Sequence, residues 1–162
     1  VILMSYDSDA TFDKRNNYLR EDTAMDEAKQ WLTSNNIYHK VIGFDSIGDK
    51  VPSELWWKVG DFLRSMPDIL VIGKKSNLVE VKGCRNVLRI KLSDLMNYLK
   101  WNEIEELHFF IHSTTENSNF LMTIDDLITC LSDSKWKIKK YKDNNKKYIA
   151  LPVESLHGWE VT

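Results

Sequence analysis

The segment that most constrains the fold runs from residue 67 to residue 83 and reads PDILVIGKKSNLVEVKG. Two short apolar runs, at 68–73 and 78–83, flank the polar sequence KKSN. Runs of this length and composition on either side of a short polar stretch are typical of a β-hairpin. The sequence therefore predicts two adjacent antiparallel strands here, and the rest of the chain must supply a sheet and a core around them.

Charged residues interrupt this predicted hairpin. Alternate side chains of a strand point to the same face, so Val79 and Val81 share one face while Glu80 and Lys82 share the other. With the valines against the core, the second face holds a carboxylate next to an ammonium group, beside Asp68 at the start of the paired strand. The predicted result is a compact cluster of two acids and one base.

Helices and strands alternate around the hairpin. Apolar residues recur at helical spacing in 23–33, 52–66, 93–101 and 123–131. In the second of these helices the apolar stripe includes Leu55 and Leu63, and in the third the expected buried side is Leu95, Met96 and Leu99. Apolar runs predict strands at 37–44 and 106–113, and a last hairpin turns across DNNK between 135–142 and 147–153. Thr23, Ser93 and Thr123 are the expected helix caps. The expected class is α/β or mixed α+β around one central sheet.

Length and composition fit one globular domain. The chain has 162 residues, of which 43% are hydrophobic and 28% charged. We expect a flexible N-terminal arm at 1–17 and a single domain at 18–162. No stretch approaches the ~20 apolar residues of a membrane span, and no signal-peptide pattern is found, so a cytoplasmic protein is expected. The abundance of Asn and Lys fits an AT-rich genome such as a phage's, which would place the protein in the host cytoplasm.

The cysteine pattern supports neither disulfides nor a cysteine zinc site. Cys84 and Cys130 lie far apart and neither belongs to a CxxC pair. We expect both to be free thiols. His108 and His112 share a face of a predicted strand, but apolar residues surround them and no third ligand has metal spacing, so they are expected to be core or rim residues.

The predicted cluster of two acids and one base has a definite chemistry. Oxygen ligands suit Mg²⁺ or Mn²⁺, which take one or two carboxylates together with waters and phosphate oxygens. A cation held there can polarise a phosphodiester and lower the pKa of a bound water. The pattern therefore indicates phosphodiester hydrolysis.

The residues Pro67-Asp68, followed after eleven residues by Glu80-Val81-Lys82 in a hairpin, resemble the motif of the PD-(D/E)XK nuclease superfamily. Members have a restriction-endonuclease-like fold and include Holliday-junction resolvases and phage nucleases. The expected element order is also similar to the α-β-β-β-α-β core of that superfamily, over residues 20–113. The predicted helix at 52–66 is an insertion relative to that core.

The resemblance implies roles for particular residues. Asp68 and Glu80 would be catalytic metal ligands, the backbone carbonyl of Val81 a third oxygen ligand, and Lys82 the catalytic lysine. Members often add a glutamate from the first helix, and Glu27 is the matching candidate because it falls on the inward stripe of that helix, where a carboxylate without a partner is costly.

Basic and polar residues on the helix after the lysine strand are a further feature of the family. Lys91, Asp94 and Tyr98 are available there, and we take Lys91 and Tyr98 as candidate nucleic-acid contacts, although none matches a fixed pattern.

A run of lysines near the C-terminus suggests another surface. Residues 135–147 hold seven lysines against Asp143 in a chain whose net charge is −2. Lys135, Lys137, Lys139 and Lys140 could follow a phosphate backbone, with Trp136 or Tyr141 stacking on bases. The alternative, which the sequence supports equally, is an edge strand that lysines protect from aggregation.

The expected function is a Mg²⁺- or Mn²⁺-dependent deoxyribonuclease that is structure-selective, with DNA as its partner and homodimerisation as an option. One rival is a module that keeps the nuclease fold but only binds nucleic acid or protein. A second rival is a small structural or assembly protein in which the hairpin is a salt-bridged sheet face, with Glu80 paired to Lys82 or another base and Glu27 facing solvent.

Overall fold

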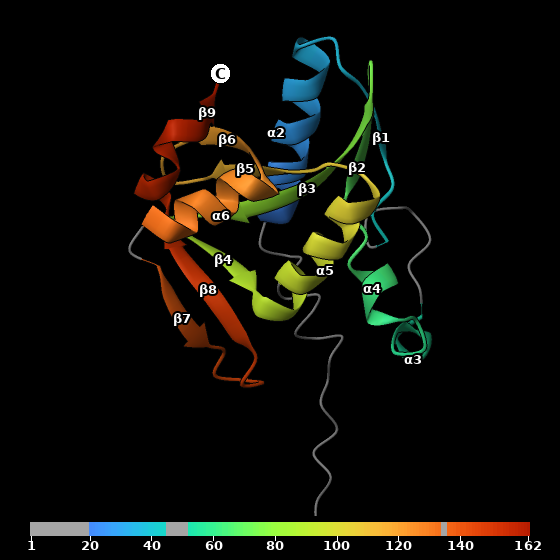
Figure 1. Ribbon diagram of the computed structural model, residues 1–162, viewed down its shortest axis with the longest axis vertical. Coiled ribbons are helices and arrows are strands. Elements are labelled where there is room, and N and C mark those ends of the chain that lie inside the picture. Colours follow the sequence, from blue (N-terminus) through green and yellow to red (C-terminus); the bar gives the residue numbers. More distant parts are fainter. Residues whose placement is uncertain (1–19, 45–51, 134–135) are drawn as a thin grey trace, which may run out of the picture.

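The computed structural model describes residues 20–44, 52–133 and 136–162, without the side chains of residues 20–22 and 53 (Figure 1). The predicted arm at 1–17 lies outside the described residues. The class is mixed α+β, as the sequence predicts: a six-stranded mixed sheet forms the centre, and a separate three-stranded antiparallel sheet lies beside it.

The predicted hairpin at 67–83 forms the middle of the central sheet. The strands, in spatial order, are β1 (Tyr38–Val41), β2 (Ile69–Ile72), β3 (Ser76–Cys84), β5 (Leu107–Ser113), β6 (Ser118–Thr123) and β9 (Glu160–Val161). Only the β3–β5 pair is parallel, and every other neighbouring pair is antiparallel. A parallel pair requires a crossover connection, and helix α5 (Leu92–Ile104) lies on the segment that makes it.

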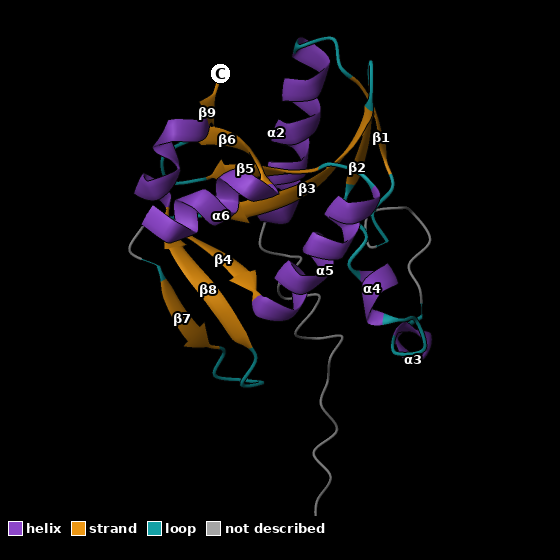
Figure 2. Ribbon diagram, in the orientation of Figure 1, coloured by secondary structure: helices purple, strands orange, loops and turns teal. Residues whose placement is uncertain are grey.

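Helices cover both faces of the central sheet (Figure 2). Helix α2 (Arg20–Ser34) packs on one face, where Ala28 and Leu32 join a cluster with Ile69, Val79 and Phe110. Helices α5 and α6 (Ile124–Asp133) and the 3₁₀ helix η1 (Val153–Trp159) contribute to the larger core on the other face. The hairpin strand β3 is therefore buried on both faces, and its polar side chains need partners within the protein.

The second sheet contains the predicted C-terminal hairpin. Its order is β4 (Val87–Lys91), β8 (Lys147–Pro152), β7 (Lys137–Lys140). Leu88, Ile90 and Leu151 turn one face of this sheet toward the larger core. The sequence does not predict β4, because its five residues run directly into helix α5 without a turn signal between them.

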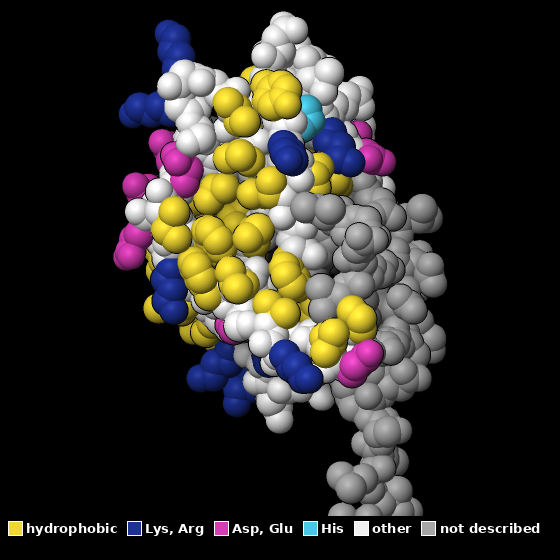
Figure 3. Space-filling model, turned by 90° about the vertical axis from the view of Figure 1, so that its right-hand side faces the viewer, with side chains coloured by type: hydrophobic (Ala, Val, Ile, Leu, Met, Phe, Trp, Pro, Cys, Tyr) yellow, Lys and Arg dark blue, Asp and Glu magenta, His cyan; other side chains and the backbone are white. Residues whose placement is uncertain are grey.

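The single helix predicted at 52–66 is wrong. The structure has two short helices, α3 (Ser53–Trp56) and α4 (Asp61–Arg64), and Gly60 caps α4 with extended backbone angles of φ −57° and ψ 141°. An extended residue at that point ends the helical path that the apolar spacing suggests. Leu55 and Leu63, expected on one buried stripe, are exposed. Figure 3 views the side of the molecule on which α3 and α4 lie in Figure 1, and hydrophobic side chains gather on it.

The predicted cap and buried stripe of the helix at 93–101 also need correction. The helix begins at Leu92, Lys91 occupies the N-cap position, and the Ser93 hydroxyl donates instead to Asp94 at 3.3 Å. Met96, expected inside, is 59% exposed. The buried residues of the helix are Asn97 and Tyr98, and Leu95 and Leu99 are half-buried against the larger core.

Other predicted boundaries agree more closely. Thr123 and Asp126 exchange hydrogen bonds at the start of α6, as the predicted cap requires. Helix α2 begins at Arg20, three residues before the predicted cap Thr23, and ends at Ser34 before Asn36, which has a φ of 57°. Among the described residues, no helix is long and apolar enough to cross a membrane.

The corrected orientation of α5 can be tested by stability measurements. Leu127 on α6 is fully buried, whereas Met96 on α5 is exposed. We expect Leu127→Ala to lower the free energy of unfolding by roughly 2–5 kcal/mol, through lost burial and a cavity. Met96→Ala should change it by less than about 0.5 kcal/mol. Urea unfolding measures both, and a loss of several kcal/mol for Met96→Ala would mean that α5 is rotated relative to this structure.

Candidate functional site

The three residues of the predicted cluster lie on one face of the central sheet. Glu80 pairs with Phe109 and Lys82 with Ile111, and both partners belong to the larger core on the α5 side. In the β2–β3 register Ile69 lies opposite Val79. Asp68, the residue before Ile69, therefore lies opposite Glu80, the residue after Val79. Directly opposed residues of an antiparallel pair share a face. The fold thus brings both acids and the lysine to the same side.

Asp68 is fixed by both neighbouring strands. Its carboxylate Oδ2 accepts a hydrogen bond from the backbone N–H of Val81 at 2.8 Å. Its backbone carbonyl accepts from the N–H groups of Ile42 and Gly43 at 2.8 and 3.1 Å. The carboxylate therefore lies at the point where β2 begins, beside the middle of β3, and it is tied to the backbone between Glu80 and Lys82.

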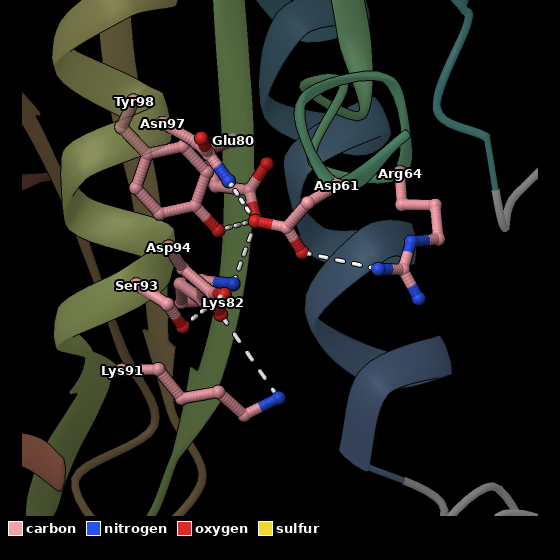
Figure 4. Close-up of polar contacts among 9 residues, drawn as sticks. All are labelled: Asp61, Arg64, Glu80, Lys82, Lys91, Ser93, Asp94, Asn97 and Tyr98. Atoms are coloured by element: carbon pink, nitrogen blue, oxygen red, sulfur yellow. Dashed lines mark hydrogen bonds and ion pairs between the residues drawn. The ribbon is translucent and has the colours of Figure 1, made fainter. Parts of the chain in front are cut away.

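Glu80 is a buried carboxylate with two close partners (Figure 4). The residue is 6% exposed. Its Oε1 lies 2.6 Å from Nζ of Lys82 and accepts a hydrogen bond from the hydroxyl of Tyr98 at 2.7 Å. A buried carboxylate is costly unless it is paired and hydrogen-bonded, and these two donors satisfy that requirement.

Lys82 keeps its charge despite its location. Its side chain is 25% exposed. Burial by itself disfavours the ammonium form, but the negative charge of Glu80 and the contacts with Glu80 and Tyr98 outweigh it and raise the pKa of Lys82 well above its usual value. At neutral pH the pair is therefore a carboxylate and an ammonium ion in contact.

Tyr98 belongs to the interior of the site, which corrects its predicted role as a nucleic-acid contact. The residue is 3% exposed and its ring packs edge-on against Phe109 with centroids 5.4 Å apart. Burial raises the pKa of Tyr98 well above its usual value; the charge of Lys82 opposes this shift and that of Glu80 adds to it, and the hydroxyl remains a donor. Its function in this structure is to hold the carboxylate of Glu80. The sequence shows that the helix after β3 carries a tyrosine, but it does not show which way the tyrosine side chain points.

The inserted helix α4 packs against α5 beside this site. Asn97, next to Tyr98 on α5, donates from its side-chain amide to Asp61 of α4 at 2.9 Å, and Arg64 donates to the same carboxylate at 3.2 Å. The rings of Phe62 and Trp101 stack with centroids 4.4 Å apart. Sequence analysis does not predict the Asp61–Asn97 contact, because the two residues are far apart in the chain and no motif connects them.

Glu27 does not join the cluster. Its carboxylate accepts a hydrogen bond from the side-chain amide of Asn119 at 3.2 Å, and the oxygen of that amide lies 2.8 Å from Nδ1 of the buried His112. His112 shares its face of β5 with Phe110, which packs under α2. Glu27 therefore serves a polar network on the face of the sheet opposite to Glu80. The same half-buried contact contradicts the second rival's expectation that Glu27 faces solvent, whereas the Glu80–Lys82 pair is the contact that this rival expects.

The metal-binding capacity of the cluster is limited to a few oxygens. In the part of the chain that the structure describes, no three His, Cys, Asp or Glu side chains gather so as to hold a metal ion. The carboxylates of Asp68 and Glu80 are the two acids of the cluster. The N–H of Val81 points to Asp68. In a β-strand, the C=O and N–H groups of one residue point toward the same neighbouring strand. The carbonyl of Val81 therefore points to the same side as its N–H, toward Asp68.

The remaining predicted nucleic-acid contacts are at the surface. Lys91 lies 4.0 Å from Asp94, close to the start of α5 (Figure 4). Lys137, Lys139 and Lys140 are all exposed on the edge strand β7. Lys135 lies outside the described residues.

Neither cysteine forms a disulfide, as predicted, and both are buried. Burial, and to a smaller extent Glu116, raises the pKa of the Cys84 thiol to about 11. A thiol that is protonated at neutral pH is a poor nucleophile. Cys84 is therefore a packing residue in this structure.

No family model matches the sequence, and no curated protein matches it. A solved structure described as a nuclease from a fusselovirus is similar over 81% of this chain and 77% of its own, with 11% sequence identity and a TM-score of 0.44.

The contacts around Glu80 predict an alkaline loss of stability. The pKa values of Lys82 and Tyr98 are both raised in the folded protein, from 10.5 and 10.0. The folded state then binds more protons than the unfolded state above about pH 10, so stability must fall as pH rises through that range. We expect the free energy of unfolding, measured with urea in EDTA, to fall more between about pH 9 and about pH 11 in the wild type than in Lys82→Met/Tyr98→Phe. Equal losses in the two proteins would show that these contacts do not form.

Proposed function

We propose that this protein is a Mg²⁺- or Mn²⁺-dependent nuclease that hydrolyses DNA phosphodiester bonds at Asp68, Glu80 and Lys82. The observation that carries the proposal is their arrangement. Asp68 is bonded to the backbone N–H of Val81 at 2.8 Å, and on either side of Val81 the side chains of Glu80 and Lys82 meet at 2.6 Å. Two acids and a charged lysine on neighbouring strands are the groups that metal-assisted phosphodiester hydrolysis requires.

The order of the elements supports the same proposal. Helix α2, strands β1, β2 and β3, helix α5 and strand β5 follow one another in the chain, with α3, α4 and β4 as insertions. The first three strands form an antiparallel meander, and β5 returns parallel to β3. This order agrees with the resemblance to the PD-(D/E)XK superfamily, whose core is α-β-β-β-α-β.

The donor set fits Mg²⁺ better than a soft metal. Asp68 and Glu80 would hold the cation through carboxylate oxygens, with the carbonyl of Val81 as a third oxygen. Mg²⁺ commonly takes one or two carboxylates and keeps several waters, so a site with two acids is sufficient. Such a cation, when bound, would polarise the phosphodiester and lower the pKa of its water.

The remaining groups would act from their positions around Glu80. The ammonium group of Lys82, with its raised pKa, would stabilise negative charge that develops on the phosphate. The hydroxyl of Tyr98 would keep the Glu80 carboxylate oriented, since it donates to Oε1 at 2.7 Å. Both groups are in place before any substrate binds, so little reorganisation is needed.

A second candidate rests on the same contact. The close Glu80–Lys82 pair, with Tyr98 completing it, also satisfies a buried acid in a protein that performs no chemistry. In that case the fold would serve as a module that binds nucleic acid or another protein. The two candidates differ in whether Lys82 is needed for cutting or only for stability. Homodimerisation stays a prediction in either case.

Cutting assays separate the two candidates. We expect the protein to cut DNA in the presence of Mg²⁺ or Mn²⁺ and not in EDTA, with single-stranded, duplex and branched substrates compared. Lys82→Ala should reduce the rate roughly 10²–10³-fold, the cost of losing one charge-stabilising group. Lys74→Ala, in the exposed β2–β3 turn, is the matched control and should cut like the wild type. Cutting in EDTA, or equal cutting by Lys82→Ala, would contradict the nuclease proposal.

The position of Glu27 gives a further prediction. It lies on the opposite face of the sheet, bonded to Asn119, so Glu27→Gln should leave the Mg²⁺-dependent rate within about threefold of the wild type. Asp68→Asn removes a proposed ligand and should lower that rate at least as much as Lys82→Ala. Single-turnover cutting measures both, and a loss for Glu27→Gln as large as that for Asp68→Asn would mean that α2 contributes to the site.

A further inference from the structure

The three-stranded sheet carries a basic face that all three of its strands build. Directly paired residues of an antiparallel sheet project from the same face. The pairing forms two rows: Arg89 and Lys137 flank Ala150, and Lys91 and Lys139 flank Tyr148. Leu88 and Ile90 alternate with these residues and belong to the core. The four basic side chains, called the basic face below, therefore point away from the main core.

An aromatic pair supports the centre of the basic face. The guanidinium of Arg89 lies 5.6 Å from the ring centroid of Tyr148, within the range of a cation–π contact. The ring of Tyr141 lies 4.3 Å from the same ring on the other side of the hairpin turn. Tyr148 is only 8% exposed, so its ring is not available for stacking on a base. The aromatic pair thus positions the guanidinium of Arg89, and the groups available on the basic face are its positively charged side chains.

The charge on this sheet is of one sign. The three strands have the sequences VLRIK, KIKK and KYIALP, which contain six basic residues and no acidic one. Asp94 lies near Lys91, at 4.0 Å. A concentration of positive charge in a protein whose net charge is −2 favours a polyanionic partner at this place.

Edge protection alone does not explain the arrangement. Lysines on β7 would suffice to keep that edge strand from pairing with another chain. Arg89 comes from β4, the strand at the other edge of the sheet, and its guanidinium lies over the ring of Tyr148 on the central strand. The face therefore has a feature that protection of β7 does not require.

The turn of the same hairpin approaches the candidate site. A hollow of 340 Å³ is lined by Lys146 and Lys147 of the hairpin, Leu92 and Ser93 at the start of α5, and Asp61 of α4. Asp61 accepts the hydrogen bond from Asn97, the neighbour of Tyr98. Lys91 connects the two regions, because it belongs to the basic face and immediately precedes α5. A ligand on the basic face would therefore meet the start of α5, the helix whose Tyr98 donates to Glu80.

We propose that the basic face binds the phosphate backbone of a DNA duplex and holds it next to the cluster of Glu80 and Lys82. The inference rests on the proposed function, since it assigns the substrate of that site. Binding would be independent of base sequence, because lysine and arginine on a flat sheet face reach phosphates and the ring at the centre of that face, Tyr148, is buried. A duplex fits better than a single strand, whose binding sites typically use open aromatic platforms.

The test is the salt dependence of DNA binding without cutting. A labelled duplex of mixed sequence is titrated in EDTA at several salt concentrations with the wild type, Lys137→Gln/Lys139→Gln and Arg89→Gln. Each lost phosphate contact lowers the slope of log K against log salt by about 0.9, so the double variant should lose about 1.8 and bind several-fold more weakly. Arg89→Gln should lose about 0.9.

Controls keep the two proposals separate. Lys74→Gln/Lys75→Gln removes the same charge from the exposed β2–β3 turn and should keep the wild-type slope. Binding is measured in EDTA and cutting in Mg²⁺, so that the two are scored independently. An unchanged slope in Lys137→Gln/Lys139→Gln, an equal loss in the control, or wild-type binding to anionic lipid vesicles but not to DNA would each overturn the inference. If the slopes change as expected but no protein cuts DNA, the inference that the basic face binds DNA is supported and the nuclease proposal is wrong.

Discussion

The carboxylate of Glu80 is held inside the folded protein, and the organisation of the candidate site follows from how its charge is compensated. It lies in the middle of β3, on the face that the larger core covers. A buried, unpaired carboxylate would cost several kcal/mol, so the fold must place a cation and a donor beside it. Lys82, two residues along the same strand, supplies the cation, and Tyr98 from α5 supplies the donor.

This requirement connects the sheet to its covering helix. The parallel return of β5 beside β3 makes α5 the crossover, so α5 runs across the face that carries Glu80. Asn97, the neighbour of Tyr98, ties the inserted helix α4 to the same place through Asp61. The insertion and the crossover helix thus border one small polar region in a face that is otherwise apolar. A hollow lies beside α5 on the side of the C-terminal hairpin, and Asp61, which bonds to Asn97, is one of the residues that line it.

Much of this arrangement could be predicted from local sequence, and the rest depends on contacts between distant segments. The two-residue period of β3 was sufficient to place Glu80 and Lys82 on one face and Val79 on the other, because strand geometry leaves no alternative. The period of a helix leaves its rotation less certain, so Met96 was expected inside and Tyr98 outside.

The errors at the insertion and at Glu27 have a similar origin. The spacing of Leu55 and Leu63 fits a helix, but Gly60 in an extended conformation divides the segment, and no local signal shows that α4 would instead dock on α5. The inward stripe of α2 places Glu27 correctly as half-buried. Which face of the sheet α2 covers depends on the tertiary fold, and that decides whether Glu27 meets Glu80 or Asn119.

The central claim is that Asp68 and Glu80 form one site for a divalent cation, and calorimetric titration with Mn²⁺ tests it most directly. The account predicts a saturable site in the wild-type protein that is lost in both Asp68→Asn and Glu80→Gln while circular dichroism shows all three proteins folded. Mn²⁺ binding that persists unchanged in either variant, or no binding by the wild type, would contradict the account.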